Sequence, residues 1–224
     1  MNESAQAAAT PPAAPAPPGA VRTADRRRGG QHFQVLKELA DCHASLGNSD
    51  RAEAIYREAA ELRPELPEPD VGLGMLAVQD DELDRAERAF RRALEKDDRC
   101  AEAHGGLAIV HQRRREYPEA LEVYLKCLEL DSDNLVALLG LFQTSCKMGT
   151  FGKIIHYLRQ YLQRHPGDTS VLFCLASLHA REGQYADARE ALRTVLTLEP
   201  DKAEAAELLA QVEARLPEEA GATK

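Results

Sequence analysis

The sequence contains no tryptophan, and aromatic residues make up only 5% of its 224 positions. It also has no run of about 20 apolar residues, which is the length that a membrane-spanning helix needs. The N-terminus, Met1-Asn2-Glu3-Ser4, has neither the basic start nor the apolar core of a secretory signal. We therefore expect no membrane partner and a cytoplasmic location.

Cysteine pairs at metal-binding or redox spacing are missing as well. The five cysteines are odd in number and include no C-x-x-C pair, which favours a reducing compartment over a disulfide framework. Cys100 and His104 are four residues apart, but two ligands do not make a zinc site. There is no glycine-rich phosphate loop either. The sequence thus predicts neither a metal nor a cofactor, and no enzymatic activity.

Net positive charge is also absent. The chain carries a net charge of −9, while its first 30 residues hold four arginines and two acidic residues, so the remainder carries −11. An acidic body repels phosphate backbones, and nucleic acid is therefore not expected as a partner.

What the sequence does contain is an internal repeat. Apolar side chains spaced by three and four positions predict two amphipathic helices, at 101–114 and 117–130. The same template returns every 34 positions from Phe33 to Lys202, without an insertion or deletion. One apolar position of each unit is occupied by Leu39, Leu73, Leu107, Leu141 and Leu175, and a helix stop is expected at Pro64, Asp98, Ser132, Pro166 and Pro200.

This pattern resembles the tetratricopeptide repeat, a 34-residue helix–turn–helix unit. The resemblance implies an all-α fold: a right-handed α-solenoid of five repeats, at 33–66, 67–100, 101–134, 135–168 and 169–202. A C-terminal helix at 203–216 is expected to cap the stack, because its outer side is polar. The Ala/Pro-rich residues 1–30 are expected to form a disordered tail, with the array spanning 31–216, and residues 217–224 are expected to form a flexible tail.

Two units depart from the template. Glycine closes the first helix of the first, fourth and fifth repeats, but Arg115 takes this place in the third, so its turn is predicted to differ. The fourth repeat carries Phe142, Ile154 and Tyr161 where its siblings mostly have small residues. Either the helices of this repeat lie further apart, or Ile155, Tyr157 and Tyr161 widen an apolar face for a partner or a second copy.

The resemblance also implies a binding surface, because the first helices of successive repeats line a concave groove in this family. Three of its expected members, Arg113, Lys147 and Arg181, form what we call the basic row, at a single repeated position. The apolar floor comprises Val71, Met75, Ile109, Leu139 and Phe173, which core packing is not expected to require, and Gln143 and Ser177 complete the groove.

An apolar floor beside a basic row suits a peptide or helix with apolar anchors and acidic groups. The leading hypothesis is a non-enzymatic protein–protein interaction adaptor or scaffold. One alternative is a self-assembling structural protein, a homo-oligomer that uses the aromatic fourth repeat. The other is a regulatory subunit of an enzyme complex. The family's chaperone-tail clamp is not expected, because Asp41 and Glu102 would repel a terminal carboxylate.

Overall fold

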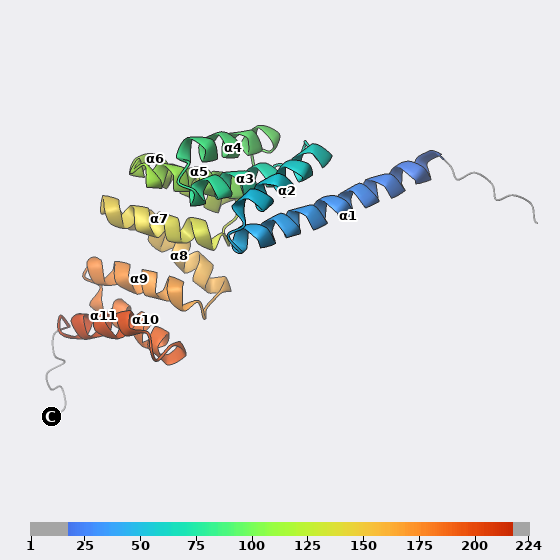
Figure 1. Cartoon of the computed structure of the whole chain (residues 1–224). Coiled ribbons are helices and arrows are strands. Elements are labelled where there is room, and N and C mark those ends of the chain that lie inside the picture. The colour runs from blue at the N-terminus through green and yellow to red at the C-terminus, as the bar shows by residue number, and fades with distance from the viewer. Residues whose placement is uncertain (1–17, 217–224) are drawn as a thin grey trace, which may run out of the picture. The chain divides into compact units, whose positions relative to one another are not determined.

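The computed structural model describes residues 18–216, with side chains from residue 30 onward, and every regular element in this part of the chain is an α-helix (Figure 1). The chain divides into two compact units at Pro64. None of the described helices is both long and apolar enough to cross a bilayer. The all-α class predicted from the sequence is confirmed.

The first unit contains α1 (Pro18–Ser45) and α2 (Ser49–Leu62), which pack against each other as a hairpin. Tyr56 is buried between them and donates a hydrogen bond to Asp41 Oδ1 at 2.6 Å. Helix α1 begins within the stretch expected to be a disordered tail, and no break marks residue 30. No proline interrupts the chain between Pro18 and Pro64. Residues 1–17 and 217–224 lie outside the described part.

The second unit holds nine of the described helices, each packed against the next in chain order (Figure 1). Its repeats have a first and a second helix, as predicted, and form an α-solenoid. The first helices are α3 (Glu68–Gln79), α5 (Ala101–Arg113), α7 (Leu135–Met148) and α9 (Thr169–Arg181). The second helices are α4 (Leu83–Lys96), α6 (Tyr117–Leu130), α8 (Gly152–Arg164) and α10 (Tyr185–Leu198), and α11 (Ala203–Glu213) follows alone, three residues shorter than expected.

The second helices end in strict register. Lys96, Leu130, Arg164 and Leu198 are their last residues, each 34 positions after the one before. Each helix stops two residues ahead of the position at which the sequence predicts a stop. The period read from side chains is therefore the period of the backbone.

Glycines in the first helices make room for large rings from the second helices. The ring of Phe90 on α4 is fully buried and lies against both Gly74 on α3 and Gly106 on α5. Tyr124 on α6 lies in the same way against Gly140 on α7. In these two repeats, a single aromatic residue thereby packs against the next repeat.

The turn of the third repeat does not differ from the others, so that prediction was wrong. Arg115 adopts a left-handed backbone with φ of 65°, close to the 74° of Gly47. The N–H of Glu116 donates to the carbonyl oxygen of His111 at 2.9 Å, and the two side chains also meet, with Nδ1 and Oε2 2.7 Å apart. These bonds offset the cost of the left-handed conformation for a residue with a β-carbon.

The fourth repeat accommodates its bulky residues by looser pairing, since α7 and α8 contact each other less than the helices of the neighbouring repeats. Ile154 and Tyr161 are buried, and Tyr161 donates a hydrogen bond to Asp168 Oδ2 at 3.1 Å. Tyr161 therefore does not lie on an exposed apolar face. This geometry agrees with the interpretation that the helices have moved apart.

Leu39 is the most exposed member of the repeated leucine position. Leu39 on α1 is 45% exposed, whereas Leu107 on α5 is 9% exposed and packs in a cluster with Phe90 of the preceding repeat. In the part of the chain that the structure describes, no hairpin precedes the first repeat, so no ring equivalent to Phe90 packs on Leu39.

Candidate functional site

All ten residues expected in the groove lie on first helices of the second unit, and none of them is buried. Val71, Ile109, Leu139, Phe173 and Ser177 are half-buried, while Met75, Arg113, Gln143, Lys147 and Arg181 are exposed. The same side of each first helix therefore remains in contact with solvent.

The apolar floor also contributes to packing, which the sequence did not anticipate. Val71 and Ile109 pack against the buried cluster that contains Phe90. Leu139 packs against the next cluster along the stack, and Phe173 against the last one. These side chains have one side on the core and the other toward solvent, so the floor is rigidly held.

A polar connection crosses the middle of this surface. Gln112 on α5 donates from Nε2 to Gln143 Oε1 on α7 at 3.3 Å. The Oε1 of Gln112 in turn accepts a hydrogen bond from the buried Tyr124 hydroxyl at 2.8 Å. Gln143 is thus tied to the core through a neighbouring side chain, and two successive first helices are linked at the surface.

The members of the basic row have different surroundings. Arg113 lies 3.6 Å from the carboxylate of Asp81, and both side chains are largely exposed. The guanidinium of Arg181 instead lies over the ring of Phe151, 6.0 Å from its centroid. Lys147 has no ion-pair partner among the described residues.

Arg215 occupies the same repeat position as the basic row and was not among the predicted groove residues. It stands one repeat period after Arg181, so the period itself could have found it. Its guanidinium lies 5.9 Å from the ring centroid of Tyr185 and donates to the Tyr185 hydroxyl at 3.3 Å.

The structure brings three of the expected groove residues together in one cleft, at the C-terminal end of the stack. This cleft of about 450 Å³ is open between α9 and α11. Phe173, Ser177 and Arg181 come from α9, and the opposite wall carries their equivalents one repeat period later, Glu207, Gln211 and Arg215. Its other lining residues are Ala180, Tyr185, Glu204 and Leu208.

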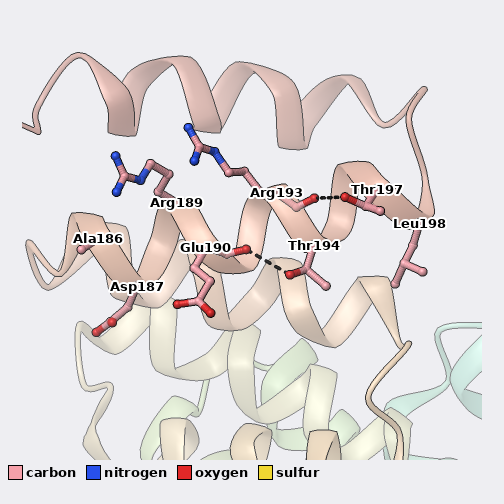
Figure 2. Close-up of a pocket in the computed structure, with 8 residues that line it drawn as sticks. All are labelled: Ala186, Asp187, Arg189, Glu190, Arg193, Thr194, Thr197 and Leu198. Carbon is pink, nitrogen blue, oxygen red and sulfur yellow. Dashed lines mark hydrogen bonds between the residues drawn. The ribbon is translucent and has the colours of Figure 1, made fainter.

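A second hollow follows the outer side of α10 (Figure 2). All of its lining residues come from this one helix. The Thr194 hydroxyl donates to the Glu190 carbonyl at 3.1 Å, and the Thr197 hydroxyl to the Arg193 carbonyl at 2.7 Å. Its threonine hydroxyls already bond within the helix, and no second wall faces them. We therefore assign it no binding role.

The buried thiols are poorly suited to nucleophilic chemistry. Burial is the largest cause of the raised pKa of Cys100, about 11, and of Cys127 and Cys174, about 12 each. A thiol with such a pKa is almost entirely protonated near neutral pH, and the thiolate is the reactive form.

The repeated histidines pair within their own turns. His179 is buried and its Nδ1 contacts Gln184 Oε1, as His111 contacts Glu116. In the described part of the chain, no group of three or more histidine, cysteine or acidic side chains is arranged to hold a metal ion.

Comparisons with known proteins agree with this geometry. Three family models, each described as tetratricopeptide repeat, match residues 35–66, 71–134 and 147–212, together more than half of the chain. No curated protein matches the sequence.

Several solved structures share the fold. One, from work on the functional characterization of Pseudomonas aeruginosa pilF, is 21% identical with a TM-score of 0.71, over 84% of this chain and 86% of that one. YrrB, described as a TPR protein with an unusual peptide-binding site, is 18% identical with a TM-score of 0.59, over 80% and 90%. The APC/C hetero-tetramer Cut9–Hcn1 is 19% identical with a TM-score of 0.67, over 80% of this chain but 36% of that one.

At such identities the solved structures support the fold alone. Proteins with this fold are generally protein–protein interaction modules and typically not catalytic. The repeat period, the helix packing and the three family matches lead to one conclusion. The chain belongs to the tetratricopeptide repeat family.

Proposed function

We propose that this chain is a non-enzymatic adaptor that binds a peptide or helix of a partner protein along the solvent-facing side of α3, α5, α7 and α9. One observation carries the proposal: a continuous set of half-buried apolar side chains on the first helices lies beside exposed cations. A core that needed all of these side chains would have buried them. An acidic protein that displays cations on one face is suited to acidic partners.

The partner class follows from the two kinds of side chain. Half-buried Ile109, Leu139 and Phe173 offer apolar contact area on a rigid surface, which favours an amphipathic helix or an extended segment with apolar anchors. The exposed cations of the basic row add charge pairing with carboxylates. YrrB, a protein of similar fold, is described as having a peptide-binding site, which supports a peptide as the partner here.

The test is charge reversal of the basic row. The triple variant Arg113→Glu, Lys147→Glu and Arg181→Glu is compared with a matched control, Arg88→Glu, Lys153→Glu and Arg159→Glu, whose residues are exposed on second helices. Both variants change the net charge equally. Proteins retained from cell lysate by each immobilised variant are identified by mass spectrometry, and circular dichroism checks the fold.

We expect a partner that the wild-type chain and the control retain and the row variant loses. Retention of the same proteins by the row variant would remove the assignment of this surface, provided its helical signal equals that of the wild type. Loss of the partner by both triple variants would mean that retention depends on the net charge of the chain and not on the position of the cations.

A further inference from the structure

Three cations at the C-terminal end of the stack recur at one position of the repeat. Lys147, Arg181 and Arg215 are spaced by one repeat period and are all exposed. We call them the open cations, because none has a carboxylate within ion-pair distance among the described residues. Arg113, the preceding member of the row, differs in this respect, since Asp81 lies 3.6 Å from it.

An aromatic ring at the N-terminal start of the preceding second helix lies behind two of the open cations. Phe151 precedes Arg181 by 30 residues, and Tyr185 precedes Arg215 by the same interval. A ring face attracts a guanidinium and limits its motion, but it contributes no full negative charge. The two arginines are therefore held in place while their positive charge remains available to a ligand.

The third open cation follows the same sequence rule. Tyr117 precedes Lys147 by 30 residues and opens α6, as Tyr185 opens α10. In the preceding repeat the equivalent residue is Leu83, and there Arg113 pairs with Asp81 instead. Aromatic residues thus coincide with the cations that lack a carboxylate partner.

The charges that line the cleft between α9 and α11 favour one position for a ligand carboxylate. Arg181 is the last residue of α9 and Arg215 lies two residues beyond the end of α11, whereas Glu204 and Glu207 are in the first half of α11. Gln211 lies between Glu207 and Arg215 in sequence, and Ser177 is its equivalent one repeat period earlier. A ligand carboxylate is attracted to the arginine end and repelled at the glutamate end.

We propose that the open cations dock an acidic segment of the partner protein, in polyproline II conformation, with a carboxylate at about every third residue. The inference rests on the proposed adaptor function and adds the chemistry of the bound segment. Helices of neighbouring repeats pack roughly 10 Å apart. A polyproline II segment advances about 3.1 Å per residue with three residues per turn, so every third side chain shares one face and reaches a successive cation. Clustered carboxylates of the same number would meet one or two cations only.

The probes are fluorescein-labelled peptides of about 12 residues, long enough when extended to span the three cations. One has glutamate at every third position with leucine and serine between, a second has the same composition with the glutamates adjacent, and a third has glutamine in place of glutamate. Fluorescence anisotropy at low salt measures their affinity for the full chain.

The protein variants are two triples matched in charge. Lys147→Ala, Arg181→Ala and Arg215→Ala removes the open cations, and Arg88→Ala, Lys153→Ala and Arg159→Ala removes exposed cations from second helices. We expect the wild-type chain to prefer the spaced peptide about fivefold over the clustered one. The open-cation variant should lose about tenfold in affinity and lose this preference, while the control changes less than about twofold.

A further variant, Tyr185→Leu, keeps every charge but removes the ring behind Arg215. We expect a loss of about two- to threefold for the spaced peptide, because Arg215 must then be ordered on binding. Equal affinity for the spaced and clustered peptides, equal losses in the two triples, or no binding by the wild-type chain would each overturn the proposal.

The results that would contradict the adaptor function differ from those that would contradict the docking proposal. If the glutamine peptide binds as well as the spaced peptide, the open cations have no docking role, and the apolar surface can still serve a partner. If the wild-type chain retains no protein from lysate although it binds the spaced peptide, the adaptor assignment itself is lost.

Discussion

The ring of Phe90 fills the space next to Gly106 in which a side chain on that residue would have to lie. Phe90 is fully buried and comes from α4, whereas Gly106 lies in the middle of α5, the first helix of the next repeat. Glycine ordinarily weakens a helix, but here it lets two repeats approach closely. The contact gives a direct test of the packing.

We expect Gly106→Ala to lower the free energy of unfolding by about 1–3 kcal/mol, because the added methyl group displaces the Phe90 ring. Its neighbour provides the control, since a β-carbon on Gly105 would meet only the Cys127 sulfur, at an ordinary 3.5 Å. Gly105→Ala should be neutral or stabilise by up to about 1 kcal/mol through helix propensity. Urea unfolding measures both, and equal effects would contradict the described contact.

The repeated leucine position should show two different costs. Leu107→Ala removes a side chain packed with Phe90 and should cost about 2–5 kcal/mol. Leu39→Ala, at the same position of the first repeat, should cost less than about 1 kcal/mol because Leu39 is 45% exposed. Denaturant unfolding of both variants checks this. A large cost at Leu39 would show that another surface covers it.

The thiols should react at very different rates. Cys42 is exposed, while Cys127 is fully buried and has a pKa raised to about 12 by burial. With a chromogenic thiol reagent at pH 8, we expect one fast phase that disappears in Cys42→Ser, and at least about 100-fold slower reaction of Cys127 until the chain unfolds. A fast phase that persists in Cys42→Ser would indicate that the half-buried Cys146 or a buried thiol reacts without unfolding.

Stability should decline in alkaline solution. Below pH 9 the Cys127 thiol is protonated in both states, and between pH 9 and 12 the unfolded thiol loses its proton while the folded one keeps it. The free energy of unfolding then falls by about 1.4 kcal/mol per pH unit for each such thiol. Cys127→Ala should therefore have a shallower decline above pH 9 than the wild-type chain, as measured by urea unfolding. Identical slopes would mean that this thiol titrates alike in both states.

The sequence predicted the helices well because their signals are local and repeat. The expected segments 101–114 and 117–130 correspond to α5 and α6, within one residue at every boundary. The structure differs from the predictions where a local hydrogen bond, or the lack of a packed neighbouring hairpin, changes a backbone conformation or the burial of a side chain. Arg115 adopts the left-handed backbone conformation because hydrogen bonds between Glu116 and His111 stabilise the turn around it.

The candidate groove could be predicted only as a set of positions. The repeat period identifies which residues share a face, and it would also have given Arg215. It could not show that Val71 and Ile109 pack partly on the core, or that Arg113 has a carboxylate partner and Arg181 a ring. Those relationships join residues of different repeats, whose distances depend on how the helices pack.

By itself the sequence determined the period, the ends of the second helices and the family, because the spacing of apolar side chains and of helix-stopping residues is local to each hairpin. Tertiary structure decided which large side chains are covered and which cations remain without a carboxylate. Tyr161 is buried and Leu39 is exposed because the burial of a side chain depends on the hairpin packed next to it. The position of a residue within its repeat does not specify that neighbour.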